Sequence, residues 1–166
     1  MALIKDGKLV EDAFTPVAND AELPAADPVV VSLARWRDQR DELIARGRAL
    51  GIRLRSDESP AQIAEDLPHF ELVALEFPGF KDGRAYSYAR LLRERYGFKG
   101  EVRAVGDVLL EQLLFMHRCG FDAFELESEH AVDDWVTATS EISVWYQPTV
   151  DGRATAMQLR QERDRG

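Results

Sequence analysis

Three segments decide the fold of this chain: Phe70-Glu-Leu-Val-Ala-Leu-Glu-Phe77, Ala85-Tyr-Ser-Tyr-Ala-Arg-Leu-Leu-Arg-Glu-Arg-Tyr96 and Glu101-Val-Arg-Ala-Val105. The first and third are short apolar runs, which is typical of buried strands. The second repeats apolar residues at helical spacing and predicts a helix over 83–96 that Gly97 ends. Strand, helix and strand in this order predict two parallel strands joined by a right-handed crossover.

The same alternation continues on both sides of these segments. We expect strands at 29–33, 52–55 and 121–126, and helices at 34–49 (ended by Gly51), 60–67, 108–119 and near 130–142. Residues 142–146 fit a helix or a strand. The pattern predicts an α/β fold with a mostly parallel sheet of about five strands and flanking helices. The sheet is either open or an incomplete β/α barrel, because a full barrel needs roughly 250 residues.

The two ends of the chain depart from this pattern. Leu3-Ile-Lys-Asp-Gly-Lys-Leu-Val10 places Asp-Gly between apolar pairs and predicts a β-hairpin. Residues 15–28 are rich in Pro, Ala, Asp and Asn, so they predict an irregular linker. The sequence therefore predicts a hairpin appendage at 1–14, a single α/β domain at 29–150 and a polar tail at 151–166.

Composition excludes several classes of function. A formal net charge of −9 repels a phosphate backbone, so nucleic acid is not an expected partner. Cys119 is the single cysteine, which excludes disulfides within the chain and a four-cysteine cluster. The three histidines lie far apart, so no metal site is expected. No run of apolar residues has the length of a membrane span, and the first residues lack a signal-peptide core; we expect a cytoplasmic protein without a membrane partner.

Candidate site residues gather where the predicted strands end. In parallel sheets ligands bind beyond the carboxyl ends of the strands, near helix N-termini. Three such corners can be identified, at residues 76–84, 106–107 and 125–129.

The first corner suits a small anion. Gly83 would let the backbone approach a ligand, while Arg84 and Arg90 would hold the anion beside a helix N-terminus, with Ser87 as a hydroxyl donor. The alternative is structural: Asp82 caps the helix, Gly83 forms a turn and the arginines are solvated.

The second corner consists of Gly106 and Asp107. Asp107 either caps the following helix or acts as an acid or base, and Glu76 is the second candidate base. Arg103 lies in an otherwise buried strand, so it must find a carboxylate; it is the third candidate anion contact. Its candidate partners are Glu76, Glu125 and Asp122.

The segment 108–119 is apolar nearly all round. A helix of this kind is either deeply buried or covered by a partner. We therefore expect a homodimer, formed through this helix or through the aromatic segment 142–148. Cys119, at the predicted end of the helix, fits core packing or a nucleophile.

The chain resembles a bacterial family known as domain of unknown function 934. The resemblance rests on Phe77-Pro-Gly-Phe-Lys-Asp-Gly-Arg-Ala-Tyr-Ser87, Ala89-Arg-Leu-Leu-Arg-Glu-Arg-Tyr-Gly97, Val102-Arg-Ala-Val-Gly-Asp-Val108 and Arg118-Cys-Gly-Phe-Asp-Ala-Phe124. It extends to the opening hairpin and to Ser143-Val-Trp-Tyr-Gln-Pro148. The family carries an oxidoreductase label linked to sulfite reduction, so the resemblance implies an association with that pathway. One cysteine cannot hold an iron–sulfur cluster, and no dinucleotide-binding glycine fingerprint follows a strand; no cofactor is expected, and we interpret the label as pathway context.

Three hypotheses follow from the sequence, which leaves open whether the chain is catalytic. The first is an accessory protein of assimilatory sulfite reduction that binds sulfite reductase or a pathway anion at the strand ends. The second is a metal-free acid–base enzyme that uses Asp107 or Glu76. The third is an oxidoreductase that holds a flavin or nicotinamide in an atypical way.

Overall fold

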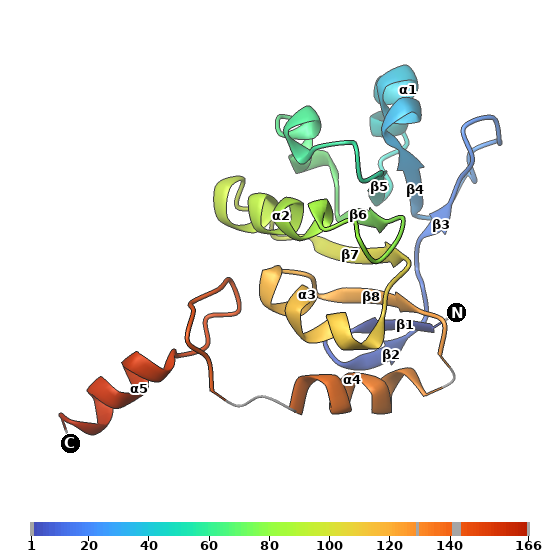
Figure 1. The fold of residues 1–166 in the computed structure, drawn as a ribbon. Coiled ribbons are helices and arrows are strands. Elements are labelled where there is room, and N and C mark those ends of the chain that lie inside the picture. Colours follow the sequence, from blue (N-terminus) through green and yellow to red (C-terminus); the bar gives the residue numbers. More distant parts are fainter. Residues whose placement is uncertain (1, 129, 141–143, 166) are drawn as a thin grey trace.

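One eight-stranded sheet forms the frame of the molecule. The computed structural model describes residues 2–128, 130–140 and 144–165. The strand order is β2-β1-β8-β7-β6-β5-β4-β3 (Figure 1). The strands are β1 (Ala2–Lys5), β2 (Lys8–Val10), β3 (Thr15–Pro16), β4 (Val29–Ser32), β5 (Leu50–Leu54), β6 (Leu72–Phe77), β7 (Glu101–Gly106) and β8 (Ala123–Leu126). Strands β3 to β8 run parallel, and the sheet curls as half a barrel would, so the predicted α/β fold is confirmed.

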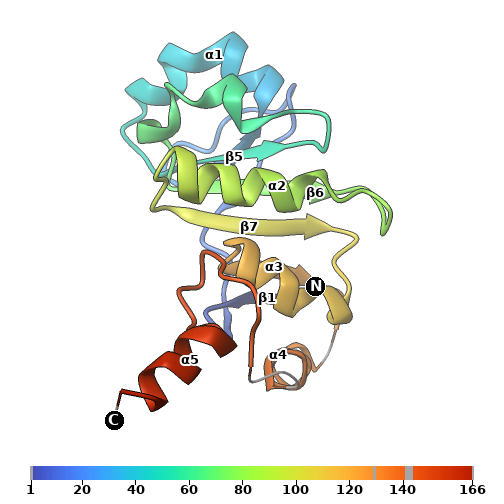
Figure 2. The ribbon, with the colours of Figure 1, turned by 60° about the vertical axis from the view of Figure 1, so that its left-hand side comes forward.

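The helices lie along one face of the sheet. Helix α1 (Leu33–Ala45) follows β4, α2 (Arg84–Arg90) follows β6, α3 (Leu113–Cys119) follows β7 and α4 (Ala131–Ser140) follows β8. Figure 2 shows α1, α2 and α3 stacked in that order along the sheet. Their buried aliphatic and aromatic side chains join one core with alternate strand residues such as Ile52, Val73 and Val102. This arrangement follows from right-handed crossovers between neighbouring strands.

The N-terminal hairpin is part of the main sheet. Asp6 and Gly7 have φ values of 49° and 76°, as the predicted Asp-Gly turn requires. Strand β1 pairs antiparallel with β8, and the buried side chain of Ile4 belongs to the core. The hairpin therefore forms one edge of the sheet and is not an appendage to it. Residues 11–14 then lead to β3 at the opposite edge, as Figure 1 shows.

Several predicted helices differ in their bounds. Helix α1 ends at Ala45, with Arg46 as its C-cap residue, whereas Gly51 lies inside β5; the prediction that Gly51 ends the helix is wrong. A Cβ at Gly51 would lie 2.9 Å from Val30 Cγ2, so this glycine allows β4 and β5 to pack closely. The predicted helix over 60–67 is instead two 3₁₀ turns, Pro60–Ile63 and Leu67–His69.

The apolar segment 108–119 is not one continuous helix. Residues after β7 form a loop and a 3₁₀ turn, Leu110–Gln112, before α3 begins at Leu113. Leu113 and Met116 are buried against the sheet, whereas Phe115 is exposed. Gly97 adopts positive φ at the end of its helical segment, where the sequence predicts a helix end, and Gly120 does the same after α3. Helix α2 continues through a π-helical turn, Leu91–Arg95.

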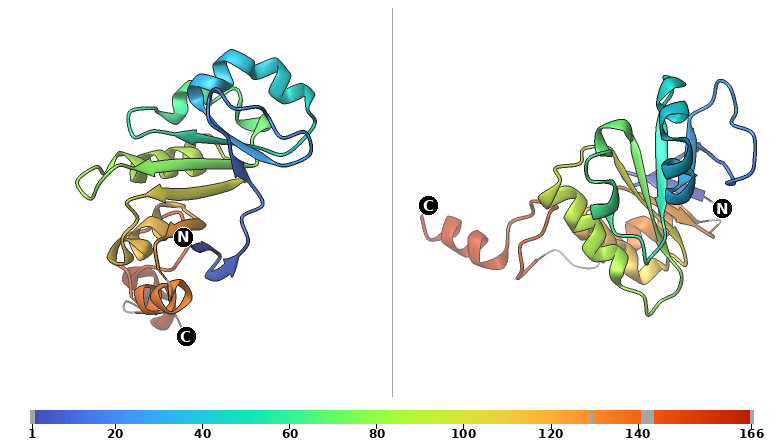
Figure 3. Two further views of the ribbon diagram at one scale, coloured as in Figure 1. Left: turned by 90° about the vertical axis from the view of Figure 1, so that its right-hand side faces the viewer. Right: turned by 90° about the horizontal axis from the view of Figure 1, so that it is seen from above.

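The expected polar tail contains a surface helix. Helix α5 (Ala156–Arg163) projects away from the body in the right-hand view of Figure 3. Trp145 forms an isolated bridge to Thr155. Residues 142 and 143, part of the segment left open between helix and strand, lie outside the described residues. Within the described ranges, no helix combines the length and apolar character needed to cross a bilayer.

Candidate functional site

The face of the sheet opposite the helices carries a row of charged side chains. Ala74 pairs with both Arg53 and Arg103 on the neighbouring strands, and Ala123 pairs with both Arg103 and Lys5. Paired residues share a face, so Arg53, Arg103 and Lys5 all lie on this one. A small apolar cluster lies beside them, formed by Val30, Leu72, Ala74 and Val105 with Phe14 packed against it. This face is the inner face of the half-barrel.

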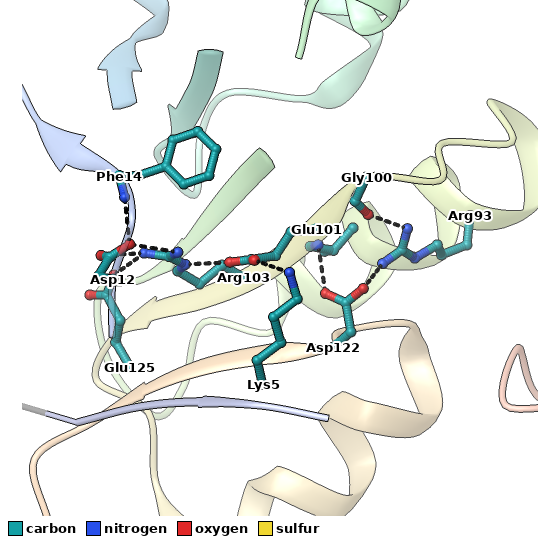
Figure 4. Close-up of polar contacts among 10 residues, drawn as sticks. Lys5, Asp12, Phe14, Arg93, Gly100, Glu101, Arg103, Asp122 and Glu125 are labelled. Carbon is teal, nitrogen blue, oxygen red and sulfur yellow. Dashed lines mark hydrogen bonds and ion pairs between the residues drawn. The ribbon is translucent and has the colours of Figure 1, made fainter. Parts of the chain in front are cut away.

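Arg103 is the centre of the charged row. It is 2% exposed. Its Nε donates to Glu101 Oε1 at 2.7 Å, and its two outer nitrogens donate to Asp12 Oδ2 and Oδ1 at 2.7 and 3.0 Å (Figure 4). Glu125 accepts a further bond at 3.2 Å. Lys5 Nζ donates to the second oxygen of Glu101 at 2.8 Å. Buried charges persist only when paired in this way.

The ion pairs shift the pKa values of their members. Burial opposes the charge on Arg103, but hydrogen bonds to Asp12 and the negative charge of Glu101 hold its pKa well above the usual value. Burial would raise the pKa of Asp12, but the hydrogen bonds from Arg103 and the Phe14 amide, together with the positive charge of Arg103, lower that pKa. The hydrogen bond to Glu101 raises the pKa of Lys5. All three groups are therefore charged at neutral pH.

The predicted partners of Arg103 are confirmed only in part. Glu125 does contact it, whereas Glu76 pairs with Arg53 at 3.2 Å and Asp122 pairs with Arg93 at 2.7 Å. Asp12 and Lys5 were missed, because they approach from the N-terminal segment. The sequence holds no signal for these contacts, since they depend on the hairpin joining the sheet edge.

The first predicted corner does not present free arginines. Arg84 donates to both oxygens of Asp82, at 3.0 and 2.6 Å, and to Ser56 Oγ at 3.0 Å. This pairing lowers the pKa of Asp82 well below its usual range. Arg90 pairs with Glu94 along the helix at 3.1 Å.

The other features of this corner are structural. Gly83 is the N-cap residue of α2, and Asp82 accepts from the Arg84 amide at 3.2 Å. A Cβ at Gly83 would meet nothing closer than Tyr86 at 3.7 Å, so this position does not require glycine for space. Ser87 lies exposed on the outer side of the helix.

The second and third corners form one pocket. Its volume is about 360 Å³, and it is lined by Gly106, Asp107, Val108, Leu109, Leu110, Leu126, Glu127, Ser128 and Asp134. Gly106 has φ +91°, and a Cβ there would lie 2.5 Å from the Phe77 carbonyl oxygen, so only glycine fits. Asp107 lines this pocket, whereas Glu76 and Arg103 do not. The lining is acidic, which opposes binding of an anion.

Two further groups are structural. Arg93 donates to the carbonyls of Gly120, Phe98 and Gly100 and to Asp122, which ties α2 to β7 and β8. Cys119 is buried, and burial raises the pKa of its thiol, so it packs as an apolar side chain. Among the residues that the structure describes, no group of His, Cys, Asp and Glu is arranged to hold a metal ion.

Comparison with known families matches residues 51–157 to a family described as bacterial protein of unknown function, DUF934. The chain belongs to this family. The DUF934 region runs from β5 to the first residues of α5 and includes Glu101, Arg103 and Glu125. Asp12 and Lys5 lie outside the matched residues. No curated protein matches the chain.

Proposed function

We propose that this DUF934 protein is an accessory protein of assimilatory sulfite reduction that binds sulfite reductase. The pathway comes from the family resemblance of the sequence. The mode of action, binding to a protein surface, is supported by one structural observation, the position of α5.

Helix α5 has eight residues, and all of its residues from Met157 onward are exposed. Isolated helices shorter than about 12–15 residues are marginal in water and depend on packing against other elements. A capping box between Thr155 and Gln158 satisfies its first amides, but that is a local contribution. The large apolar side chains of Met157 and Leu159 are exposed to solvent, so they contribute no hydrophobic stabilisation to the helix. A protein partner that covers α5 would supply the missing packing.

The base of α5 is firmly attached to the body. The guanidinium of Arg118 stacks 4.0 Å from the Trp145 ring and donates to Asp151 at 3.0 Å. Thr149 also donates to Asp151 at 2.8 Å. The segment before α5 thus presents the helix in a fixed direction, which lowers the entropy cost of docking.

The second mode considered from the sequence, anion binding at the strand ends, gains less support. Arg84 and Arg90 already pair with carboxylates, and the pocket at the carboxyl ends of β7 and β8 is acidic. Of the two candidate bases, Glu76 pairs with Arg53 at 3.2 Å, and Asp107 lines the acidic pocket.

Binding of purified sulfite reductase to the immobilised chain tests the proposal. Replacing Met157 and Leu159 together by Asp should weaken binding by about tenfold or more, because these residues lie on different sides of the helix and a partner on either side loses an apolar contact. Replacing Val132 and Val136 on α4 together by Asp is the matched control, since it places the same added charge at exposed apolar positions elsewhere. The control should bind as the wild type does.

A deletion strain provides the test in the cell. It should grow poorly on sulfate as the sole sulfur source and recover on cysteine, and the Met157/Leu159 variant should fail to restore growth. Absence of binding to sulfite reductase, combined with normal growth on sulfate, would show the proposal to be wrong.

A further inference from the structure

The contact between Asp12 and Arg103 has the geometry with which arginine binds a free carboxylate. Both outer nitrogens of Arg103 face one carboxylate, at 2.7 and 3.0 Å, in the two-pronged arrangement of arginine–carboxylate recognition. The guanidinium itself is buried and is held from behind by Glu101. The orientation of the guanidinium is therefore fixed in advance, and it can bind the Asp12 carboxylate or the carboxylate of a ligand at the same position.

Asp12 belongs to a segment that side chains hold in place. We call residues 11–14 the strap. No backbone–backbone hydrogen bond joins the strap to the rest of the described chain. Asp12 attaches it to Arg103, and Phe14 packs on the apolar cluster of the inner face (Figure 4). Segments with few backbone hydrogen bonds open at low free-energy cost.

An open groove lies beside Asp12. It has a volume of about 520 Å³ and is lined by Ala2, Leu3, Leu9, Val10, Glu11 and Asp12. Leu3 and Val10 are paired across the hairpin, so their side chains share the face on which Arg103 lies. Arg103 does not line the groove itself; it lies behind Asp12, whose carboxylate it binds. This combination suits a molecule with an apolar body and one carboxylate.

We propose that Arg103 and this groove form a binding site for an organic carboxylate, which the strap closes with Asp12 as its internal occupant. A ligand carboxylate takes the place of the Asp12 carboxylate, and its apolar body lies along Leu3 and Val10. One carboxylate replaces another, so the cluster of Lys5, Arg103, Glu101 and Glu125 keeps its charge balance. The exchange keeps Arg103 paired with a carboxylate. A buried arginine without such a partner would strongly destabilise the fold.

Asp12→Ala provides the first test. The substitution removes a carboxylate, the group that acetate supplies. The melting temperature of this variant should fall in sodium chloride and recover more than half of the loss in sodium acetate of equal ionic strength, with saturation. Acetamide, of the same size but uncharged, should not restore it, and the wild type should not respond to acetate. Should Asp12→Ala fail to fold, Asp12→Asn, which keeps a hydrogen-bond acceptor, takes its place.

The second test uses the unmodified chain and hexanoate, whose alkyl body fits the groove. Asp12 competes from within at an effective concentration in the millimolar range, so hexanoate is applied at roughly 10–100 mM. The Phe14 amide, which donates to Asp12 Oδ1 at 3.0 Å, should exchange with deuterium faster than in sodium chloride, while amides of β6 and β7 should not change. Equal effects of acetate and chloride on the Asp12 variant, or a strap whose exchange hexanoate does not alter, would overturn the proposal.

Discussion

At Gly7, backbone conformation and packing both require glycine. Its φ of +76° lies in the left-handed region, and a Cβ would lie 2.6 Å from the Trp135 indole nitrogen. Trp135 stacks on Phe124 with ring centroids 5.0 Å apart. This glycine therefore allows the hairpin turn to pack against α4.

Gly7→Ala should lower the free energy of unfolding by more than the about 1–2 kcal/mol that a left-handed backbone costs alone. Gly47→Ala is the matched control, because Gly47 has φ +57° and a Cβ there would meet nothing within 4 Å. Urea unfolding of both variants measures the difference. Equal losses would show that contact with Trp135 contributes nothing.

Asp12 predicts a pH dependence of stability. Its folded pKa is lower than its unfolded value of about 3.9. Its contribution is therefore complete above the unfolded pKa and is lost as pH falls through the folded pKa. Urea unfolding of the wild type and Asp12→Asn should give a stability difference that is constant from neutral pH down to about pH 5 and shrinks below about pH 4. A difference that grows on acidification would contradict the charged pair with Arg103.

At the scale of elements, the C-terminal segment is joined to the body largely through Arg118. It contacts Trp145, Asp151 and the Gln147 carbonyl. No strand pairing beyond the isolated Trp145–Thr155 bridge supports this segment within the described residues. Its attachment therefore depends on few side chains.

Arg118→Gln should release the segment without unfolding the sheet. Limited proteolysis should cleave the variant faster between residues 144 and 165, and the melting temperature should change little. Arg95→Gln, at an exposed arginine beside Tyr96, is the control and should resist cleavage as the wild type does. If both variants are cleaved equally, another contact holds the segment.

At the scale of the whole molecule, the N-terminal residues complete the sheet. Strand β1 covers the edge of β8, Ile4 fills the core, and Lys5 and Asp12 balance the buried charges around Arg103. A chain without these residues would expose a strand edge and leave Arg103 with fewer partners.

Removal of residues 1–14 should therefore abolish cooperative unfolding, or produce aggregation. Circular dichroism and gel filtration measure this outcome. Removal of residues 157–166 is the control; the described residues of this segment are exposed, so the remaining chain should keep its melting temperature. A stable, monomeric 15–166 fragment would mean that the hairpin is dispensable.

The predicted strands and helices follow local patterns, and most are confirmed because local physics determines them. Val73 and Val102 lie in apolar runs that only buried strands explain, and Gly97 and Gly120 end helical segments at positive φ. Gly51 was misread because strand packing, not helix capping, requires it there. The segment 108–119 is apolar nearly all round, but α3 starts only at Leu113 and leaves the Phe115 side chain exposed.

In the candidate site, too, the features set by local sequence could be predicted, and those set by long-range contacts could not. Gly106 and Asp107 were placed correctly at a strand end, since a strand–turn–helix pattern is local. The partners of Arg84, Arg90 and Arg103 could not be derived in full, because ion pairing depends on distances that only the folded chain defines. The pairing of Asp12 with Arg103 joins residues 91 positions apart.

The sequence by itself determined the α/β class, the order of the parallel strands along the chain and the family. The tertiary structure decided that the hairpin closes the sheet edge, that the arginines are paired and that α5 stands free. The physical reason is the range of the interactions: periodicity and turn chemistry act over a few residues, whereas edge pairing and buried charge balance act between segments that only folding brings together.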